Sequence, residues 1–351
     1  MPGPGTTDLA ATPVSPTASS RVDRAEGALL GLAVGDALGM PTQYLPRAVV
    51  DRLYAGLTWF EPGPEANEIS RGMPAGRVTD DTDQALIVAR ALVAGDGHVP
   101  PGRLAADLLS WEAQMVATGS LDLLGPSTKR ALTALAGGAD PEESGRWGDT
   151  NGAAMRIAPV GVLVPPEPLD RLVDRVSEVS RPTHNTGVAI AGASAVAAAV
   201  STGVEGGTFE DALDAAVLAA RQGARRGAYV AGADVATRIV WAVDTVRGAG
   251  SEATALDAVA YLVGTGIATQ ESVPAAFALL ALAPDDPWRV CLAAANLGGD
   301  TDTVAAMAGA VGGALHGRAA FGDAAVALVT RVNDLDLTPL VARLLELRDA
   351  S

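Results

Sequence analysis

Cysteine and lysine each occur once in this 351-residue chain, as Cys291 and Lys129, and aromatic residues make up only 4% of it. A single cysteine excludes an intramolecular disulfide framework and is typical of a protein in a reducing cytoplasm. Residues 1–22 contain no apolar stretch of the length that a signal peptide needs. The most membrane-like segment, at 27–40, carries Asp36 and is too short to span a bilayer. We therefore expect a cytoplasmic protein with no membrane partner.

Positive charge is also scarce, because 25 Lys and Arg residues stand against 41 Asp and Glu residues and leave a formal net charge of −16 at pH 7. A surface this acidic repels nucleic acids and anionic membranes at long range. We therefore expect no nucleic-acid binding, although a local arginine-lined site for a small phosphate-bearing molecule is compatible with the composition. The sequence does not predict an oligomeric state.

Alternating Val, Ile and Thr runs of strand length are nearly absent, so no β-sheet is predicted. The chain is instead rich in Ala, Leu and Gly, in segments whose apolar residues recur at helical spacing. The clearest segments are 84–94, 104–116, 186–201, 230–247 and 303–316. The Gly- and Pro-rich breaks between them lack the composition of domain linkers. We predict a single all-α domain over residues 23–348, after a disordered tail over residues 1–22.

Four glycines fall on one face of an expected helix. They are Gly27, Gly31, Gly35 and Gly39, at every fourth position. Each glycine within a helix costs about 1 kcal/mol relative to alanine. Close packing against a second helix offsets that cost, because the missing side chains let the two backbones approach. We interpret these glycines as the packing face of a central buried helix.

A first cluster of polar residues lies directly before the segment predicted to be helical from about Ala85. It reads Thr79-Asp80-Asp81-Thr82-Asp83. One cap and one acid in the first turn are enough to stabilise a helix start. Three aspartates within four residues exceed that need, because neighbouring carboxylates repel one another unless a cation lies between them. Such hard oxygen atoms are typical ligands of Mg²⁺, Mn²⁺ or Ca²⁺.

A second cluster of the same kind opens the helix predicted over 303–316. It reads Gly298-Gly299-Asp300-Thr301-Asp302-Thr303, and the residues that follow break the pattern of an EF-hand loop. Taken alone, either cluster is more typical of a helix cap than of a metal site. Two helices that both start with surplus Asp and Thr favour the metal site. If the fold brings these starts together, they form an oxygen-rich site for one or two divalent ions.

Several motifs occur in order over about residues 25–320. They are GALLGLAVGDALGMP from residue 27, TDDTDQA from 79, GDTNGAAMRIAPVG from 148, RPTHNTGVAIAGA from 181 and LGGDTDT from 297. Their combination resembles the ADP-ribosylglycohydrolase family, which includes the dinitrogenase-reductase-activating glycohydrolases. The spacing around GPSTKRAL and TNGAAMR is most similar to a bacterial branch found with nucleoside kinases and transporters. The resemblance implies a compact, orthogonal all-α bundle with a two-metal site at the base of a cleft.

The resemblance also implies which residues hold the two ions, Mg²⁺ or Mn²⁺. The implied ligands are Thr79, Asp80 and Asp81 from the first cluster and Asp300, Asp302 and Thr303 from the second. The ions are expected to bind ribose hydroxyls and to orient or acidify the attacking water. A carboxylate of this set that is not fully engaged accepts the proton of that water. Asp302 is the preferred base, Asp81 lies beside it at the catalytic centre, and Asp36 is expected in a supporting position.

One position departs from the pattern of the family. In many members an acid a few residues after the GDALG motif serves as a catalytic glutamate, and alignment by eye places Gln43 there. Glutamine can hydrogen-bond a substrate or a water but cannot accept a proton at neutral pH. Either another carboxylate is the base, or the reaction or the substrate differs.

Further candidates for substrate contacts have structural interpretations of similar weight. His184 is either a buried structural group or, as the resemblance implies, a contact to ribose or diphosphate. Asn151 and Gly152 lie in a glycine-rich stretch that either presents N–H groups to a phosphate or makes a tight turn. Ser127, at an expected helix start, is open to the same two interpretations.

The sequence leaves three functions open. The first is hydrolysis of ADP-ribose from an ADP-ribosylated protein or small molecule. The second is hydrolysis of a nucleoside-like ribosyl compound, which the resemblance to the nucleoside-kinase-associated branch suggests. The third is a non-catalytic protein that binds ADP-ribose, which Gln43 would permit. Retention of all six implied metal ligands argues against the third.

Overall fold

The computed structural model describes residues 19–120 and 124–350, and within these ranges all regular secondary structure is helical apart from two isolated β-bridges. The prediction of an all-α fold is confirmed. Of the tail predicted at residues 1–22, residues 1–18 lie outside the described residues. The first helix begins at Arg21, so the predicted domain start at residue 23 falls within this helix.

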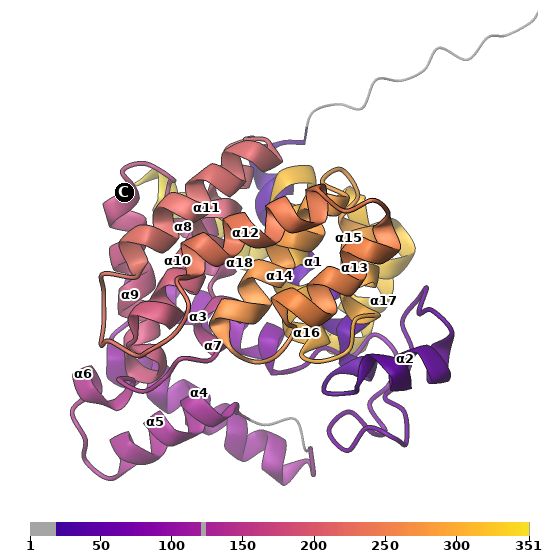
Figure 1. Ribbon diagram of the computed structural model, residues 1–351. Helices are drawn as coiled ribbons and strands as arrows, with labels where there is room; N and C mark the ends of the chain where they lie inside the picture. Colours follow the sequence, from indigo (N-terminus) through magenta and orange to yellow (C-terminus); the bar gives the residue numbers. More distant parts are fainter. Residues whose placement is uncertain (1–18, 121–123, 351) are drawn as a thin grey trace, which may run out of the picture.

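Figure 1 shows how the helices are arranged. The first half of the chain forms α1 (Arg21–Gly39), the 3₁₀ turn η1 (Met40–Thr42), α2 (Arg47–Tyr54), α3 (Asp80–Ala94), α4 (Pro101–Ala117), α5 (Pro126–Ala136), α6 (Pro141–Ser144), α7 (Gly152–Met155), α8 (Ala158–Leu163) and α9 (Leu169–His184). The second half forms α10 (Gly187–Val204), α11 (Phe209–Gly223), α12 (Val235–Arg247), α13 (Glu252–Ala258), the π-helical turn η2 (Val259–Val263), α14 (Thr269–Leu282), α15 (Pro287–Ala295), α16 (Thr301–His316), the 3₁₀ turn η3 (Arg318–Phe321), α17 (Asp323–Asn333) and α18 (Thr338–Asp349). The five predicted helical segments fall in α3, α4, α10, α12 and α16, although α12 begins later than residue 230.

Helix α10 lies in the core and packs against α11, α8, α16 and α9. In the described part of the chain it is the one helix that is long and apolar enough to cross a membrane by length and composition. However, 83% of its most apolar window is buried inside the fold, as in any core helix. The sequence-based choice of 27–40 as the most membrane-like segment was therefore wrong.

Helix α1 packs along α16 through the glycine face that the sequence predicted. A Cβ atom built on Gly31 would lie 2.1 Å from the carbonyl oxygen of Gly309. A Cβ atom on Gly35 would lie 2.1 Å from the carbonyl oxygen of Ala305. Since no side chain fits at these distances, the backbones of the two helices are in direct contact.

The order of these contacts shows that α1 and α16 are antiparallel. Gly27, near the start of α1, meets Gly313 near the end of α16. Gly39, the last residue of α1, meets Asp302 at the start of α16. The helix pair therefore carries the end of the GDALG motif to the second Asp/Thr cluster.

We expect Gly35→Ala to destabilise the protein strongly, because its Cβ would overlap a backbone carbonyl that cannot rotate away. Overpacking of this kind costs about 1–3 kcal/mol or more. Urea unfolding of the variant measures the loss. Gly102→Ala in α4 is the matched control, because its Cβ would have no heavy atom within 4 Å. A Gly35→Ala protein as stable as that control would contradict the close contact.

Two segments flank one end of this core. Figure 1 shows α2 with its adjoining loops on one side and α4 to α6 on the other, both extending below the remaining helices. Residues at the starts of α3, α7 and α16 lie together around one cavity with residues of these segments. The flanking segments and these three helix starts together enclose the site described next.

Candidate metal and active site

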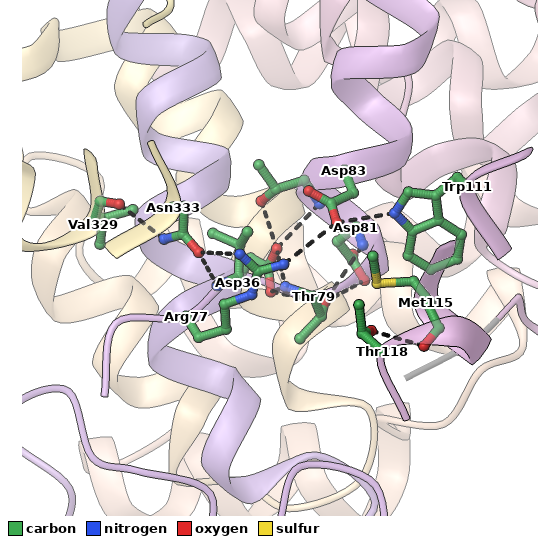
Figure 2. A network of polar contacts seen from close by, with 12 residues as sticks. Asp36, Arg77, Thr79, Asp81, Asp83, Trp111, Met115, Thr118, Val329 and Asn333 are labelled. Carbon is green, nitrogen blue, oxygen red and sulfur yellow. Dashed lines mark hydrogen bonds and ion pairs between the residues drawn. The ribbon is translucent and has the colours of Figure 1, made fainter. Parts of the chain in front are cut away.

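A buried aspartate on α1 fixes the start of α3 (Figure 2). Asp36 accepts hydrogen bonds from the backbone N–H groups of Thr79, at 3.0 Å to both carboxylate oxygens, and of Thr82, at 3.1 Å. Both threonine hydroxyls also donate to it, that of Thr79 at 2.8 Å. Burial raises the pKa of Asp36 to about 6, although these hydrogen bonds oppose the rise. Asp36 therefore links the first Asp/Thr cluster to the α1–α16 pair, in the supporting position expected of it.

The first cluster forms the opening turn of α3, which begins at Asp80, earlier than the sequence suggested. Thr79 caps the helix by accepting a hydrogen bond from the N–H of Asp81. Asp83 lies beside Trp111, whose indole N–H donates to its carboxylate at 2.9 Å (Figure 2). Capping and the indole contact account for Thr79 and Asp83. Asp80 and Asp81 are the surplus acids.

The second cluster opens α16 after a sharp turn. Gly298 and Gly299 have φ angles of +76° and +85°, which side chains other than hydrogen rarely permit. Asp300 occupies the cap position of α16, but its side chain makes no capping hydrogen bond. Its Oδ2 instead accepts a hydrogen bond from Nδ2 of Asn151 at 2.6 Å. The Asp300 carboxylate is therefore held by Asn151, a predicted site residue at the start of α7.

The two clusters meet at the end of the α1–α16 pair. The hydroxyl of Thr303 donates to Oδ2 of Asp81 at 3.2 Å, across 222 residues of sequence. Burial, followed by the neighbouring carboxylates of which Asp302 has the largest effect, raises the pKa of Asp81 well above its usual range. Burial likewise raises the pKa of Asp300 to about 6. The expectation that the fold brings both helix starts together is confirmed.

The residues of the two clusters fit a divalent cation by the type of their donor atoms. Oδ1 of Asp81 is buried and has no hydrogen-bond partner among the described residues. Carboxylates that repel one another are stabilised when a cation lies between them, and oxygen donors are the ligands that Mg²⁺ and Mn²⁺ prefer. Within residues 19–120 and 124–350, no three Asp, Glu, His or Cys side chains are already arranged to hold one ion. The fit to a divalent cation therefore rests on the type of the donor atoms and on the unpaired Oδ1 of Asp81.

A cavity of ≈ 240 Å³ lies beside the two clusters. The cluster residues that line it are Asp80, Asp300, Asp302 and Thr303. Its apolar lining residues are Ile69, Leu124, Pro126, Met155 and Ile267. The others are Gln43, Tyr44, Gly125, Thr128, Thr150, Asn151 and Gly152. These residues come from both flanking segments and from the core, so a ligand in the cavity would contact all of these parts.

The chain as a whole matches a known family. A family model described as ADP-ribosylglycohydrolase matches residues 17–351. The chain belongs to the ADP-ribosylglycohydrolase family. This confirms the resemblance seen in the motifs, and the family is hydrolytic and generally metal-dependent.

Individual relatives within the ADP-ribosylglycohydrolase family match to different extents. The chain is 38% identical over 328 residues to the uncharacterized protein YegU of Escherichia coli (strain K12), covering 93% of this chain and 98% of that protein. It is 32% identical over 160 residues to the ADP-ribosylarginine hydrolase Tri1 of Pseudomonas putida (strain GB-1), covering 42% and 38%. It is 31% identical over 177 residues to the ADP-ribosyl-dinitrogen reductase glycohydrolase of Rhodospirillum rubrum, covering 48% and 54%. A solved structure described as an ADP-ribosylglycohydrolase-related protein complex matches with a TM-score of 0.67 at 27% identity, covering 94% of this chain and 98% of that one.

The predicted site residues divide into two groups. Those that line the cavity are Gln43, Asp80, Asn151, Gly152, Asp300, Asp302 and Thr303. Those that lie behind the lining are Thr79, Asp81, Ser127 and His184, each at most 2% exposed. Thr79 and Asp81 contact cluster residues directly, so their proposed role as metal ligands is compatible with this position. Their roles stay predictions.

Ser127 and His184 are not among the residues that line the cavity, and the substrate contacts considered for them stay predictions. The hydroxyl of Ser127 accepts a weak hydrogen bond from Arg130 at 3.4 Å. The His184 ring lies against Gly152, whose added Cβ would be 2.8 Å from Cε1, and its Nε2 is 3.0 Å from the hydroxyl of Thr150. His184 is therefore separated from the cavity by Thr150 and Gly152, which line it.

Gln43 is held at the cavity with an unused donor. Its side chain is 2% exposed, and its backbone carbonyl accepts a hydrogen bond from Nδ2 of Asn67 at 2.7 Å. Its Nε2 has no hydrogen-bond partner among the described residues. The Gln43 amide nitrogen is therefore unpaired beside the cavity, and its contact with a substrate or a water stays a prediction.

No pattern in the sequence indicated a role for Tyr44, which lines the cavity and lies close enough to Asp300 to lower the pKa of that carboxylate. The Tyr44 side chain is half-exposed, and the loss of solvent on its cavity side, followed by the charge of Asp300, raises the pKa of its phenol. Tyr44 has a φ angle of +58°, and its N–H donates to the carbonyl of Gly299 at 2.6 Å. This backbone conformation depends on a contact between distant segments, which leaves no local signal.

Proposed function

We propose that this protein is a divalent-metal-dependent glycosidase that releases ADP-ribose from an ADP-ribosylated protein or small molecule. The observation that carries the proposal is the meeting of the two Asp/Thr clusters beside one cavity in an ADP-ribosylglycohydrolase chain. The proposed cofactor is Mg²⁺ or Mn²⁺, two ions held by Thr79, Asp80, Asp81, Asp300, Asp302 and Thr303. When bound, such ions supply Lewis-acid stabilisation of negative charge on oxygen.

The protein's own residues would position the water and take up its proton. Cleavage at a ribosyl carbon passes through an oxocarbenium-like transition state and requires a water whose proton is removed. Asp302 is the proposed acceptor, because it lines the cavity among the carboxylates of both clusters. Asn151 orients Asp300 through their 2.6 Å hydrogen bond. Gln43 presents an N–H donor to the water or to the leaving group.

The start of α5 is the part of the cavity suited to an anionic group. Gly125, Pro126 and Thr128 line the cavity there, and α5 has no side-chain cap. The unpaired backbone N–H groups of a helix start attract phosphate.

No Arg or Lys is among the described residues that line the cavity, so the arginine-lined site that the composition allowed is not found there. This lining favours, as a second candidate, a nucleoside-like ribosyl substrate with fewer phosphates.

A direct assay distinguishes these functions. Purified protein is incubated with Mg²⁺, Mn²⁺ or EDTA and with ADP-ribosylarginine, an ADP-ribosylated protein and a set of nucleosides. Metal-dependent release of ADP-ribose supports the main proposal, and release of ribose from nucleosides alone supports the second candidate. Binding of ADP-ribose with no turnover of any substrate would show a non-catalytic binding protein and contradict both.

We expect Gln43→Glu to change the turnover of the wild type by about tenfold or less, because Asp302 and not position 43 takes the proton. Steady-state rates of the variant and of the uncharged control Gln43→Met measure the effect. In a protein that only binds ADP-ribose, the new carboxylate would instead create hydrolysis, since a proton acceptor contributes about 10²–10⁴ in rate. A gain of that size over an active wild type would assign the base to position 43 and contradict our choice.

A further inference from the structure

A buried arginine links the first cluster to a second set of polar residues. Arg156, directly after α7, is fully buried. Its Nη1 donates to Oε1 of Gln84 at 2.8 Å, and Gln84 in turn donates through Nε2 to Asp80 at 2.6 Å. Its Nη2 donates to the hydroxyl of Thr183. Because a buried guanidinium is costly unless it is hydrogen-bonded, these contacts hold Gln84 and Thr183 in place.

The arginine fixes the direction of the hydrogen bonds that continue toward the cavity. Arginine only donates, so Oγ1 of Thr183 accepts from it. Among the described residues, the other partner of this hydroxyl is Nδ1 of His184 at 2.9 Å. The buried hydroxyl proton is hydrogen-bonded only if it is donated to Nδ1, and we therefore assign that direction. A neutral His184 then carries its proton on Nε2 and donates to Oγ1 of Thr150 at 3.0 Å.

The environment of His184 agrees with a neutral ring. The side chain is fully buried, and its burial, followed by the positive charges of Arg156 and Arg130, lowers the pKa of His184 well below its usual range. A ring that accepts at Nδ1 and is neutral has only the Nε2-protonated form left to it. The lowered pKa thus agrees with a neutral ring, and the hydrogen-bond directions select its Nε2-protonated form.

We propose that Arg156 is a positioning residue whose contact with Thr183 orients the chain of hydrogen bonds through His184 to Thr150, and that the Thr150 hydroxyl thereby donates to an oxygen of the substrate. Thr150 accepts from His184, and no other hydrogen bond of its hydroxyl is formed within the described residues. Its proton is left for the cavity, which Thr150 lines. The acceptor is a ribose hydroxyl or a phosphate oxygen.

The identity of this ligand rests on the proposed function, whereas the orientation of the chain does not. The same arginine contacts Gln84, which holds Asp80 of the first cluster. Arg156 therefore fixes one metal-ligand candidate and one substrate contact at once. This also explains why a buried His184 is present behind the lining of the cavity.

The orientation of the chain is measured without any ligand. Protein labelled with ¹⁵N-histidine contains three histidines, and His98→Gln and His316→Gln identify the signals of the other two. We expect a two-bond ¹H–¹⁵N spectrum of His184 with the proton on Nε2 and an unprotonated Nδ1. Thr183→Ser keeps the hydroxyl and is expected to keep this pattern. Thr183→Val removes the hydroxyl but not the bulk, and we expect His184 in this variant to show a mixture of the two neutral tautomers. A wild-type ring protonated on Nδ1, or on both nitrogens, would overturn the proposal.

The donor role of Thr150 is measured by binding of ADP-ribose and of adenosine in calorimetry. We expect Thr150→Val to weaken binding by about tenfold for a neutral acceptor, and further for a phosphate oxygen, with Thr150→Ser close to the wild type. A loss with ADP-ribose alone assigns the acceptor to phosphate, and a loss with both ligands assigns it to ribose. Folded Thr150→Val protein that binds as tightly as the wild type would overturn the donor role. A wild type that binds neither ligand overturns the proposed function and the ligand contact, while the histidine spectrum still decides the orientation.

Discussion

Asp302→Ala is expected to lower the rate of ribosyl-bond hydrolysis by about 10³-fold, because the change removes the proposed proton acceptor from the cavity. Asp302 lines the cavity at 3% exposure, and its charge has the largest electrostatic effect on the pKa of Asp81. A carboxylate in this position can both accept a proton and help to hold a cation. The measurement is the single-turnover rate at saturating ADP-ribosylated substrate and saturating Mn²⁺.

The control for this prediction separates the two roles of Asp302. Metal content of each protein is determined alongside the rate, since loss of a ligand alone would also lower turnover. Asp323→Ala, in the exposed first turn of α17, removes an equivalent charge from another helix start and is expected to leave the rate unchanged. An Asp302→Ala protein with full metal content and a rate within a few-fold of the wild type would exclude Asp302 as the base.

Millimolar Mg²⁺ or Mn²⁺ is expected to raise the melting temperature of the wild type by about 5 °C or more relative to EDTA. Ions that bind only the folded protein stabilise it by mass action, by about 2.7 kcal/mol at one hundred times the dissociation constant of a single site. In the metal-free protein the Asp81 carboxylate is buried beside other carboxylates, which disfavours its charge. Differential scanning fluorimetry at constant ionic strength measures the shift, and no shift with either ion would contradict a metal site.

The variant Asp81→Asn distinguishes ion binding at this site from a general effect of salt on stability. In EDTA the variant is expected to be at least as stable as the wild type, because the amide removes a repelled charge. In Mn²⁺ it is expected to be less stable than the wild type, because a ligand is missing. A variant that falls below the wild type by the same amount in both conditions would show a packing defect instead.

The sequence was sufficient wherever the signal is local. The glycines from Gly27 to Gly39 recur at helical spacing, and their contact with α16 follows from the absence of side chains. The surplus of acids beyond the need for capping marked Asp80, Asp81 and Asp300 in the same way. Each of these inferences needed only a short window of residues and one physical rule.

The remainder of the site depends on contacts between distant elements. Helix α3 begins earlier than predicted because its first turn is capped by Asp36, which belongs to another helix. The burial of His184 depends on how α9 is rotated against α7, and the contact between Arg156 and Thr183 joins two motifs that were interpreted separately. No pattern along the chain indicates such rotations, because they result from the packing of whole helices.

The direct contact between the backbones of α1 and α16 has a mechanical consequence. The two helices can slide past each other only by a whole repeat of four residues, about 6 Å, because intermediate positions place Cβ atoms against carbonyls. A one-residue insertion in α1 before Asp36 would turn that carboxylate by about 100° away from α3. The α1–α16 pair therefore holds the two clusters at a fixed distance from each other. Adaptation to a substrate of a different size is left to the flanking segments around α2 and α4 to α6.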